Sequence, residues 1–230
     1  MSFSQWVSQL DFTYVLQLSL SALASILCIT VHESAHGLVA LWMGDPTAKR
    51  MGRISLNPFK HVDLVGLVML AVAHVGWAKP VPVNSRYFKK PKQGMVLTAL
   101  AGPISNFLLA FITGFAFVLF YILSEVKGGD GILYYLWLFF LLCTQITCGL
   151  GVFNLIPIPP LDGSKVLYAI LPEKAYFKLL RFERYGMLLL IALVAFGAFQ
   201  GFLSQAVEAV SSFVIQAVSP LAILLVQIFL

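Results

Sequence analysis

Long apolar segments separated by short polar loops form the main pattern of this chain. Several of them are long enough for helices that cross the hydrocarbon of a membrane, which takes about 20 residues. The expected spans are 13–43, 94–124, 132–156, 185–203 and 206–230. The pattern therefore predicts an all-α polytopic membrane protein with about five to six membrane segments.

The apolar run at 63–77 is shorter than these spans. At ~1.5 Å per residue, a helix of this length covers roughly two-thirds of ~30 Å of hydrocarbon. All Lys and Arg except Lys127 lie within 44–93 and 157–184. Short loops rich in Lys and Arg stay in the cytoplasm, and both basic regions do so only if 63–77 enters the membrane and returns. We therefore expect a re-entrant or interfacial segment here, with the N-terminus outside.

Two proline-rich stretches interrupt the helical pattern. Prolines and valines alternate at 80–83, which predicts short extended strands within 78–93, near the cytoplasmic face. The prolines between 157 and 160 end the preceding helix. The mixed segment that follows, 163–184, predicts a short helix and then an interfacial one.

The composition agrees with a membrane protein. Hydrophobic residues make up 60% and charged residues 11% of the chain, and the mean hydropathy is +0.90, whereas a soluble domain is about a quarter charged. The net charge of +5 comes from loop residues, so it does not indicate a nucleic-acid partner. No Lys or Arg precedes Lys49, so no cleaved signal peptide is expected. We expect one domain over 1–230, with a catalytic core at about 13–170 and C-terminal helices at about 185–230.

The segment 13–43 contains an H-E-x-x-H motif, formed by His32, Glu33 and His36. Residues four apart share one face of a helix, so both imidazoles can bind one zinc ion. Glu33 lies beside them and can act as general base toward a water on the metal. Ionisable residues inside a membrane cost free energy, so those that occur there usually mark a functional site. The motif therefore predicts a zinc hydrolase site in the membrane, nearer its cytoplasmic side.

A catalytic zinc takes three protein ligands and leaves one position open. Asp162 is the strongest candidate for the third ligand, because it follows a stretch of prolines that unwinds the chain at membrane depth. The alternative role for Asp162 is a helix N-cap, and the alternative ligand is Asp63. Gly163 permits a close approach of the chain at this turn.

The expected helix 132–156 also has a polar face, made of Thr144, Thr147, Gly151 and Asn154. This face lines a cavity or forms hydrogen bonds between packed helices. For Asn154 we favour the cavity.

Three motifs occur in the order HESAHG (32–37), AGPISN (101–106) and NLIPIPPLDG (154–163). Together they resemble the site-2 protease family of intramembrane zinc metalloproteases. The stretches GRISLNPFKHVDLVG and GWAKPVPVN are similar to its compact branch, which has no PDZ or CBS domain. One departure is Leu64, where that branch usually has proline after the aspartate.

The resemblance implies one Zn²⁺ per chain, bound by His32, His36 and Asp162, with Glu33 as the base. It also implies that Asn154 stabilises the oxyanion or holds the substrate strand.

The resemblance implies the same role for Asn106, in the second long helix: to stabilise the oxyanion or to hold the substrate strand. The implied substrates are single-span membrane proteins cleaved in or near their helices, in the lipid bilayer of a prokaryotic plasma membrane. No nucleic-acid partner is implied.

Two other functions stay open. A membrane zinc transporter also places His and Asp in spanning helices, but it needs ligands along a path. A catalytically inactive scaffold for membrane partners would be expected to lose Glu33 first. An intramembrane zinc metalloprotease is the function that the residues favour.

Overall fold

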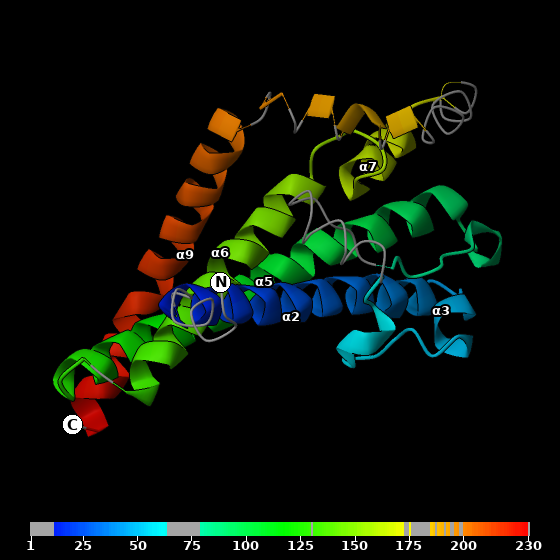
Figure 1. Ribbon diagram of the computed structural model, residues 1–230. Helices are drawn as coiled ribbons and strands as arrows, with labels where there is room; N and C mark the ends of the chain where they lie inside the picture. Colours follow the sequence, from blue (N-terminus) through cyan, green and yellow to red (C-terminus); the bar gives the residue numbers. More distant parts are fainter. Residues whose placement is uncertain are drawn as a thin grey trace, which may run out of the picture.

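Helices make up nearly all of the regular structure in the computed structural model. It describes residues 12–63, 79–129, 131–172 and 200–229, with isolated residues between 175 and 197. The long helices in this part of the chain are α2 (Phe12–Trp42), α5 (Pro91–Val126), α6 (Ile132–Asn154) and α9 (Gln200–Phe229) (Figure 1).

These four helices are long and apolar enough to cross a membrane, which confirms the prediction of a mostly helical protein with several membrane segments. The expected segment 63–77 lies outside the described residues except for its first residue, and 185–203 is described only in short pieces, so a total of five to six segments stays a prediction.

Helix α5 is the central element. It packs against α2, α6 and α9 and against the short helix α7 (Asp162–Ile170). Small residues are buried along α5 and let the neighbouring backbones approach closely. They are Gly94, Ala99, Ala101, Gly102, Ala110 and Gly114.

Hydroxyl groups join the long helices where the polar face of α6 meets α5. The Thr144 hydroxyl lies 3.0 Å from the Thr113 hydroxyl, and the Thr147 hydroxyl donates to the main-chain oxygen of Asn106 at 3.0 Å. All of these side chains are buried. Thr144 and Thr147 therefore help to hold α6 against α5.

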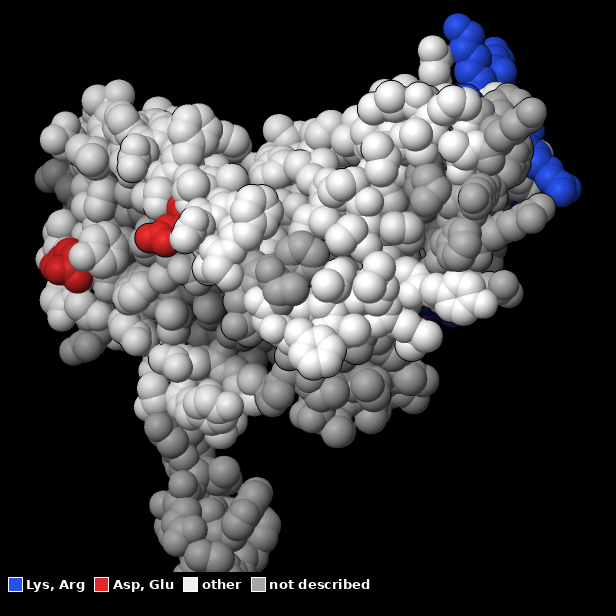
Figure 2. Space-filling view, turned by 90° about the horizontal axis from the view of Figure 1, so that it is seen from above, with Lys and Arg blue, Asp and Glu red and all other residues white. Residues whose placement is uncertain are grey.

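The polar loops gather at one end of the bundle. There α2 is followed by α3 (Thr47–Arg50) and the 3-10 turn η1 (Pro58–Lys60), and a second 3-10 turn, η2 (Ser85–Tyr87), precedes α5. In Figure 2 the visible Lys and Arg side chains lie at one end of the molecule, whereas the visible Asp and Glu side chains lie at the other. This asymmetry agrees with the sequence, in which the loops rich in Lys and Arg were expected to lie on one side of the membrane.

Residues 79–84, which we call the strap, cross this polar end. Lys79 N–H donates to the main-chain oxygen of His61 at 2.9 Å, but Val81 and Asn84 donate their N–H groups to carboxylates of α2 and the loop after it. Pro80 and Pro82 have no N–H to donate. The strands expected within 78–93 are therefore absent from the described residues, because beyond Lys79 the N–H groups of Val81 and Asn84 bind side-chain carboxylates and not another strand.

Candidate metal centre

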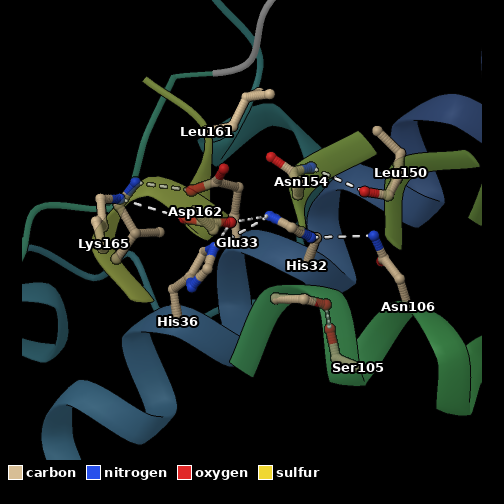
Figure 3. A network of polar contacts seen from close by, with 12 residues as sticks. His32, Glu33, His36, Ser105, Asn106, Leu150, Asn154, Leu161, Asp162 and Lys165 are labelled. Atoms are coloured by element: carbon tan, nitrogen blue, oxygen red, sulfur yellow. Dashed lines mark hydrogen bonds and ion pairs between the residues drawn. The ribbon is translucent and has the colours of Figure 1, made fainter. Parts of the chain in front are cut away.

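Three ligand-type side chains converge between α2 and α7 (Figure 3). The Nε2 atoms of His32 and His36 are 3.0 Å apart. Asp162 Oδ2 lies 3.2 Å from the first and 3.1 Å from the second. All three side chains are buried. Among the described residues, no other group of His, Cys, Asp and Glu has its ligand atoms this close together.

Local structure explains why these residues meet. His32 and His36 lie one helical turn apart on α2, so both rings leave the same face. Helix α6 ends at Asn154, and the following turn leads directly into α7, which begins with Asp162. Gly163 is needed at this turn, because a Cβ there would lie 2.3 Å from the carbonyl oxygen of Leu155. Asp162, and not Asp63, is the carboxylate brought to the histidines.

Helix α5 supports both imidazoles from behind. His36 Nδ1 lies 2.6 Å from the main-chain oxygen of Thr98, and His32 Nδ1 lies 3.0 Å from the Asn106 carboxamide nitrogen. A Cβ at Gly102 would approach atoms of both rings to 2.4–2.6 Å. The rings are thus held by hydrogen bonds at Nδ1 and by contact with a glycine, and their Nε2 atoms are left to face Asp162.

This donor set fits a zinc ion. Tetrahedral bonds of ~2.0–2.1 Å place neighbouring ligand atoms roughly 3.3 Å apart, close to the 3.0–3.2 Å separations found here. When Nε2 of His32 binds a metal, its Nδ1 carries the proton and needs an acceptor. Asn106 Oδ1 is buried and has no partner among the described residues. If the Asn106 carboxamide is rotated by half a turn, Oδ1 takes the place of Nδ2 and accepts the hydrogen bond from Nδ1–H of His32.

Lys165 binds the oxygen of Asp162 that faces away from the histidines. Its Nζ lies 3.2 Å from Oδ1. Burial by itself raises the pKa of the Asp162 carboxyl, but hydrogen bonds from His32 and His36 and the charge of Lys165 outweigh it and hold that pKa well below its usual range. The ionised carboxylate is also the form that binds a metal ion.

Glu33 faces the same cavity but is not one of the three converging groups. Its Oε2 accepts a hydrogen bond of 2.8 Å from the N–H of Val81 in the strap. The cavity measures about 170 Å³, and its walls include the metal-binding cluster, Glu33, Asn154, Lys165 and part of the strap. A carboxylate next to the cluster and open to the cavity is suited to take a proton from water.

The structure places the two asparagines differently. Asn154 lines the cavity. Its nitrogen donates to the main-chain oxygen of Leu150 at 3.0 Å, and Figure 3 shows its carboxamide oxygen pointing away from Leu150, on the side of Asp162. Asn106 is fully buried behind His32 and is not part of the cavity wall. It contacts a histidine, so the expectation that it reaches the substrate does not match its position.

Sequence reasoning did not single out Thr98 or Lys165, and it treated Val81 only as part of the expected extended segment. Lys165 carries a signal, because it lies three residues after Asp162 on the same face of a helix. Thr98 and Val81 act through main-chain atoms, which every residue type has, so the sequence gives no sign of their role.

Comparisons with known proteins agree with this chemistry. No family model matches the chain, and no solved structure matches it. It is 40% identical over 173 residues to "Putative zinc metalloprotease YwhC" of Bacillus subtilis (strain 168), covering 73% of this chain and 76% of that protein. It is 27% identical over 175 residues to "Putative zinc metalloprotease Rip2" of Mycolicibacterium smegmatis, covering 74% of this chain and 64% of that protein.

A third relative is archaeal. The chain is 32% identical over 106 residues to "Putative zinc metalloprotease MJ0611" of Methanocaldococcus jannaschii, covering 45% of this chain and 49% of that protein. From the identity to the Bacillus protein and the share of that protein it covers, we conclude that this chain belongs to the site-2 protease family, and that it is a zinc metalloprotease with Zn²⁺ as its cofactor.

Proposed function

We propose that this protein is an intramembrane protease that cleaves peptide bonds in or near the transmembrane helices of single-span membrane proteins. One Zn²⁺ per chain would be bound by His32, His36 and Asp162. The observation that carries the proposal is the convergence of their three ligand atoms within 4.8 Å of one another, beside helices long and apolar enough to span a membrane.

Zinc at such a site is a Lewis acid that lowers the pKa of water and polarises a peptide carbonyl. Glu33 takes a proton from the water that attacks the carbonyl and delivers it to the leaving amine. Asn154 binds the substrate main chain, and in its present orientation it offers an acceptor for a peptide N–H. Lys165 keeps Asp162 oriented, since it binds the other carboxylate oxygen.

The hydrogen bonds of a helix limit how a substrate can be cleaved. In an intact α-helix the carbonyls are bonded to N–H groups one turn further on, and side chains surround the backbone. The substrate segment must therefore unwind locally before one of its carbonyls can reach the cavity beside Glu33 and Asp162.

The site lies toward the basic end of the molecule. His36 is ~9 Å from the C-terminal end of α2, measured along the helix axis. Basic loops stay in the cytoplasm, so we place the site nearer the cytoplasmic side of a prokaryotic plasma membrane. Among the described residues there is a single cluster of metal ligands and no series of them along a path, which favours hydrolysis over zinc transport.

Cleavage of a single-span reporter helix in proteoliposomes tests the proposal. We expect Glu33→Gln to keep its zinc and to lower kcat at least ~100-fold, because it removes the general base. Asp162→Ala should lose both zinc and activity. Glu125→Gln is the matched control, since it makes the same change at an exposed residue at the end of α5, and it should cleave like the parent.

If Glu33→Gln and Asp162→Ala both cut as well as the parent, the proposed site is wrong. Zinc uptake into the same vesicles that depends on His32 and Asp162, without cleavage of the reporter, would identify a transporter.

A further inference from the structure

Arg53 is a buried cation that the chemistry described above does not use. Only 7% of its surface is exposed. Within the described part of the chain it forms no ion pair with a carboxylate, and a buried charge without compensation is costly. Its Nη2 instead lies 2.6 Å from the main-chain oxygen of Lys79 and 3.3 Å from that of Pro80. The guanidinium is therefore used to hold the strap.

The sequence around Arg53 turns its side chain inward. Helix α3 ends at Arg50, and the turn after it contains Gly52, which has φ +64°, a backbone conformation that favours glycine. The N–H of Arg53 then donates to the main-chain oxygen of Ala48 at 2.9 Å. This turn fixes the backbone of Arg53 against α3. By contrast, Arg50 in the last turn of the same helix is exposed.

The strap leads from Arg53 to the base. The two carbonyls that Arg53 binds come immediately before Val81, and the N–H of Val81 donates to Glu33 Oε2 at 2.8 Å. Val81 is itself buried, and its side chain lies against Gly37 of α2. The chain of contacts therefore runs from the guanidinium through one short stretch of main chain to the carboxylate of Glu33.

Other contacts fix the two ends of the strap but do not reach Glu33. Lys79 N–H binds the main-chain oxygen of His61 at 2.9 Å. Asn84 N–H binds the buried carboxylate of Asp45 at 2.6 Å. Among the described residues, Arg53 is the side chain that binds these carbonyls. The Pro80 carbonyl and the Val81 N–H belong to one peptide plane, so a bond to the carbonyl also orients the N–H.

We infer that Arg53 is a positioning residue for catalysis: it holds the strap so that the Val81 N–H fixes the carboxylate of Glu33 toward the cavity. The inference rests on the proposed role of Glu33 as general base. A carboxylate misplaced by ~1 Å can lower a rate by roughly 100-fold. The zinc ligands do not depend on this contact, because they are held by α5 and Lys165.

The test compares three variants of the full-length protein in proteoliposomes with the same reporter helix. Arg53→Met removes the donors to the strap, and Val81→Pro removes the N–H that binds Glu33. The matched control for Arg53→Met is Arg50→Met, at an exposed arginine. We expect each of the first two variants to lower kcat roughly 10- to 100-fold with bound zinc unchanged. The control should stay within about threefold of the parent.

A double variant separates positioning from a general loss of structure. If Arg53 acts through the Val81 N–H, Arg53→Met combined with Val81→Pro should cleave within about threefold of Val81→Pro alone. Arg53→Lys, which keeps one donor group, should recover part of the loss. Losses that multiply in the double variant would overturn the inference, as would zinc-free or aggregated Arg53→Met protein that Arg53→Lys does not restore.

The inference would also be overturned if Arg53→Met had the same kcat as the parent while Glu33→Gln was inactive. That result would leave the proposed function intact. Parental kcat in Glu33→Gln would instead show that the proposed function itself is wrong.

Discussion

The two histidines illustrate how single residues divide the work in this site. Their Nε2 atoms face Asp162, whereas their Nδ1 atoms are bound by Thr98 and Asn106 of a different helix. Hydrogen bonds at the far nitrogen fix the tautomer and the orientation of a metal-binding imidazole. Buried Asn106 is therefore better explained as a partner of His32 than as a group that contacts the substrate.

Lys165 provides a prediction at the same scale. Lys165→Met removes the ammonium group that holds Asp162 Oδ1, so the carboxylate can turn away from the metal. We expect the Kd for zinc to rise roughly 10- to 100-fold, the usual effect of removing a group that orients a ligand. Competition with a zinc chelator of known affinity measures it. Lys89→Met, at an exposed lysine, is the control, and equal affinities in the two variants would contradict this role.

The helices of the bundle follow from the sequence pattern. Three of them agree with the expected bounds to within three residues, whereas α9 begins at Gln200, six residues before the expected 206. The expected 94–124 and 132–156 are observed as Pro91–Val126 and Ile132–Asn154. Spans of this kind are predictable because apolar runs with few charges need no tertiary information. The strap was harder to predict, because its valines and prolines resemble a strand while its N–H groups bind carboxylates that are distant in sequence.

Helix α5 approaches α2 so closely that one added methyl group at Gly102 should disturb the site. In Gly102→Ala the new Cβ would lie 2.4–2.6 Å from atoms of both imidazoles, so the rings or the helix must move. Although alanine favours a helix by about 1 kcal/mol over glycine, we expect zinc to be lost.

Gly149→Ala in α6 is the control for this change, because the nearest atom to its Cβ would be 3.9 Å away. It should keep zinc and raise the thermal stability slightly. Normal zinc content in Gly102→Ala would show that the helices separate easily at this point.

At the scale of the whole molecule, the orientation in the membrane can be measured. The native cysteines, Cys28, Cys143 and Cys148, are completely buried, so they should react little with a membrane-impermeant thiol reagent. New cysteines placed at Lys60 and Lys90 should react only when the cytoplasmic side is accessible. A cysteine at Lys127 should react from outside. The reverse pattern would place the site at the outer face.

How the distant parts of the chain come together was only partly predictable. The H-E-x-x-H motif and the resemblance to site-2 proteases predicted which residues would meet, and the structure brings His32, His36 and Asp162 together. The supports of the site depend on how α5 packs against α2, and a sequence pattern does not encode that packing directly. Arg53 and Lys165 therefore looked like ordinary loop charges until their partners were known.

The distance along the chain between the metal ligands has a consequence for synthesis. Asp162 emerges roughly 125 residues after His36, which takes about 6–25 s at ~5–20 residues per second. During that interval the nascent polypeptide already carries both histidines and Glu33 beside its neighbours in the translocation machinery, but it lacks the third ligand. The order of translation thus keeps the unfinished enzyme inactive until its later helices have been made.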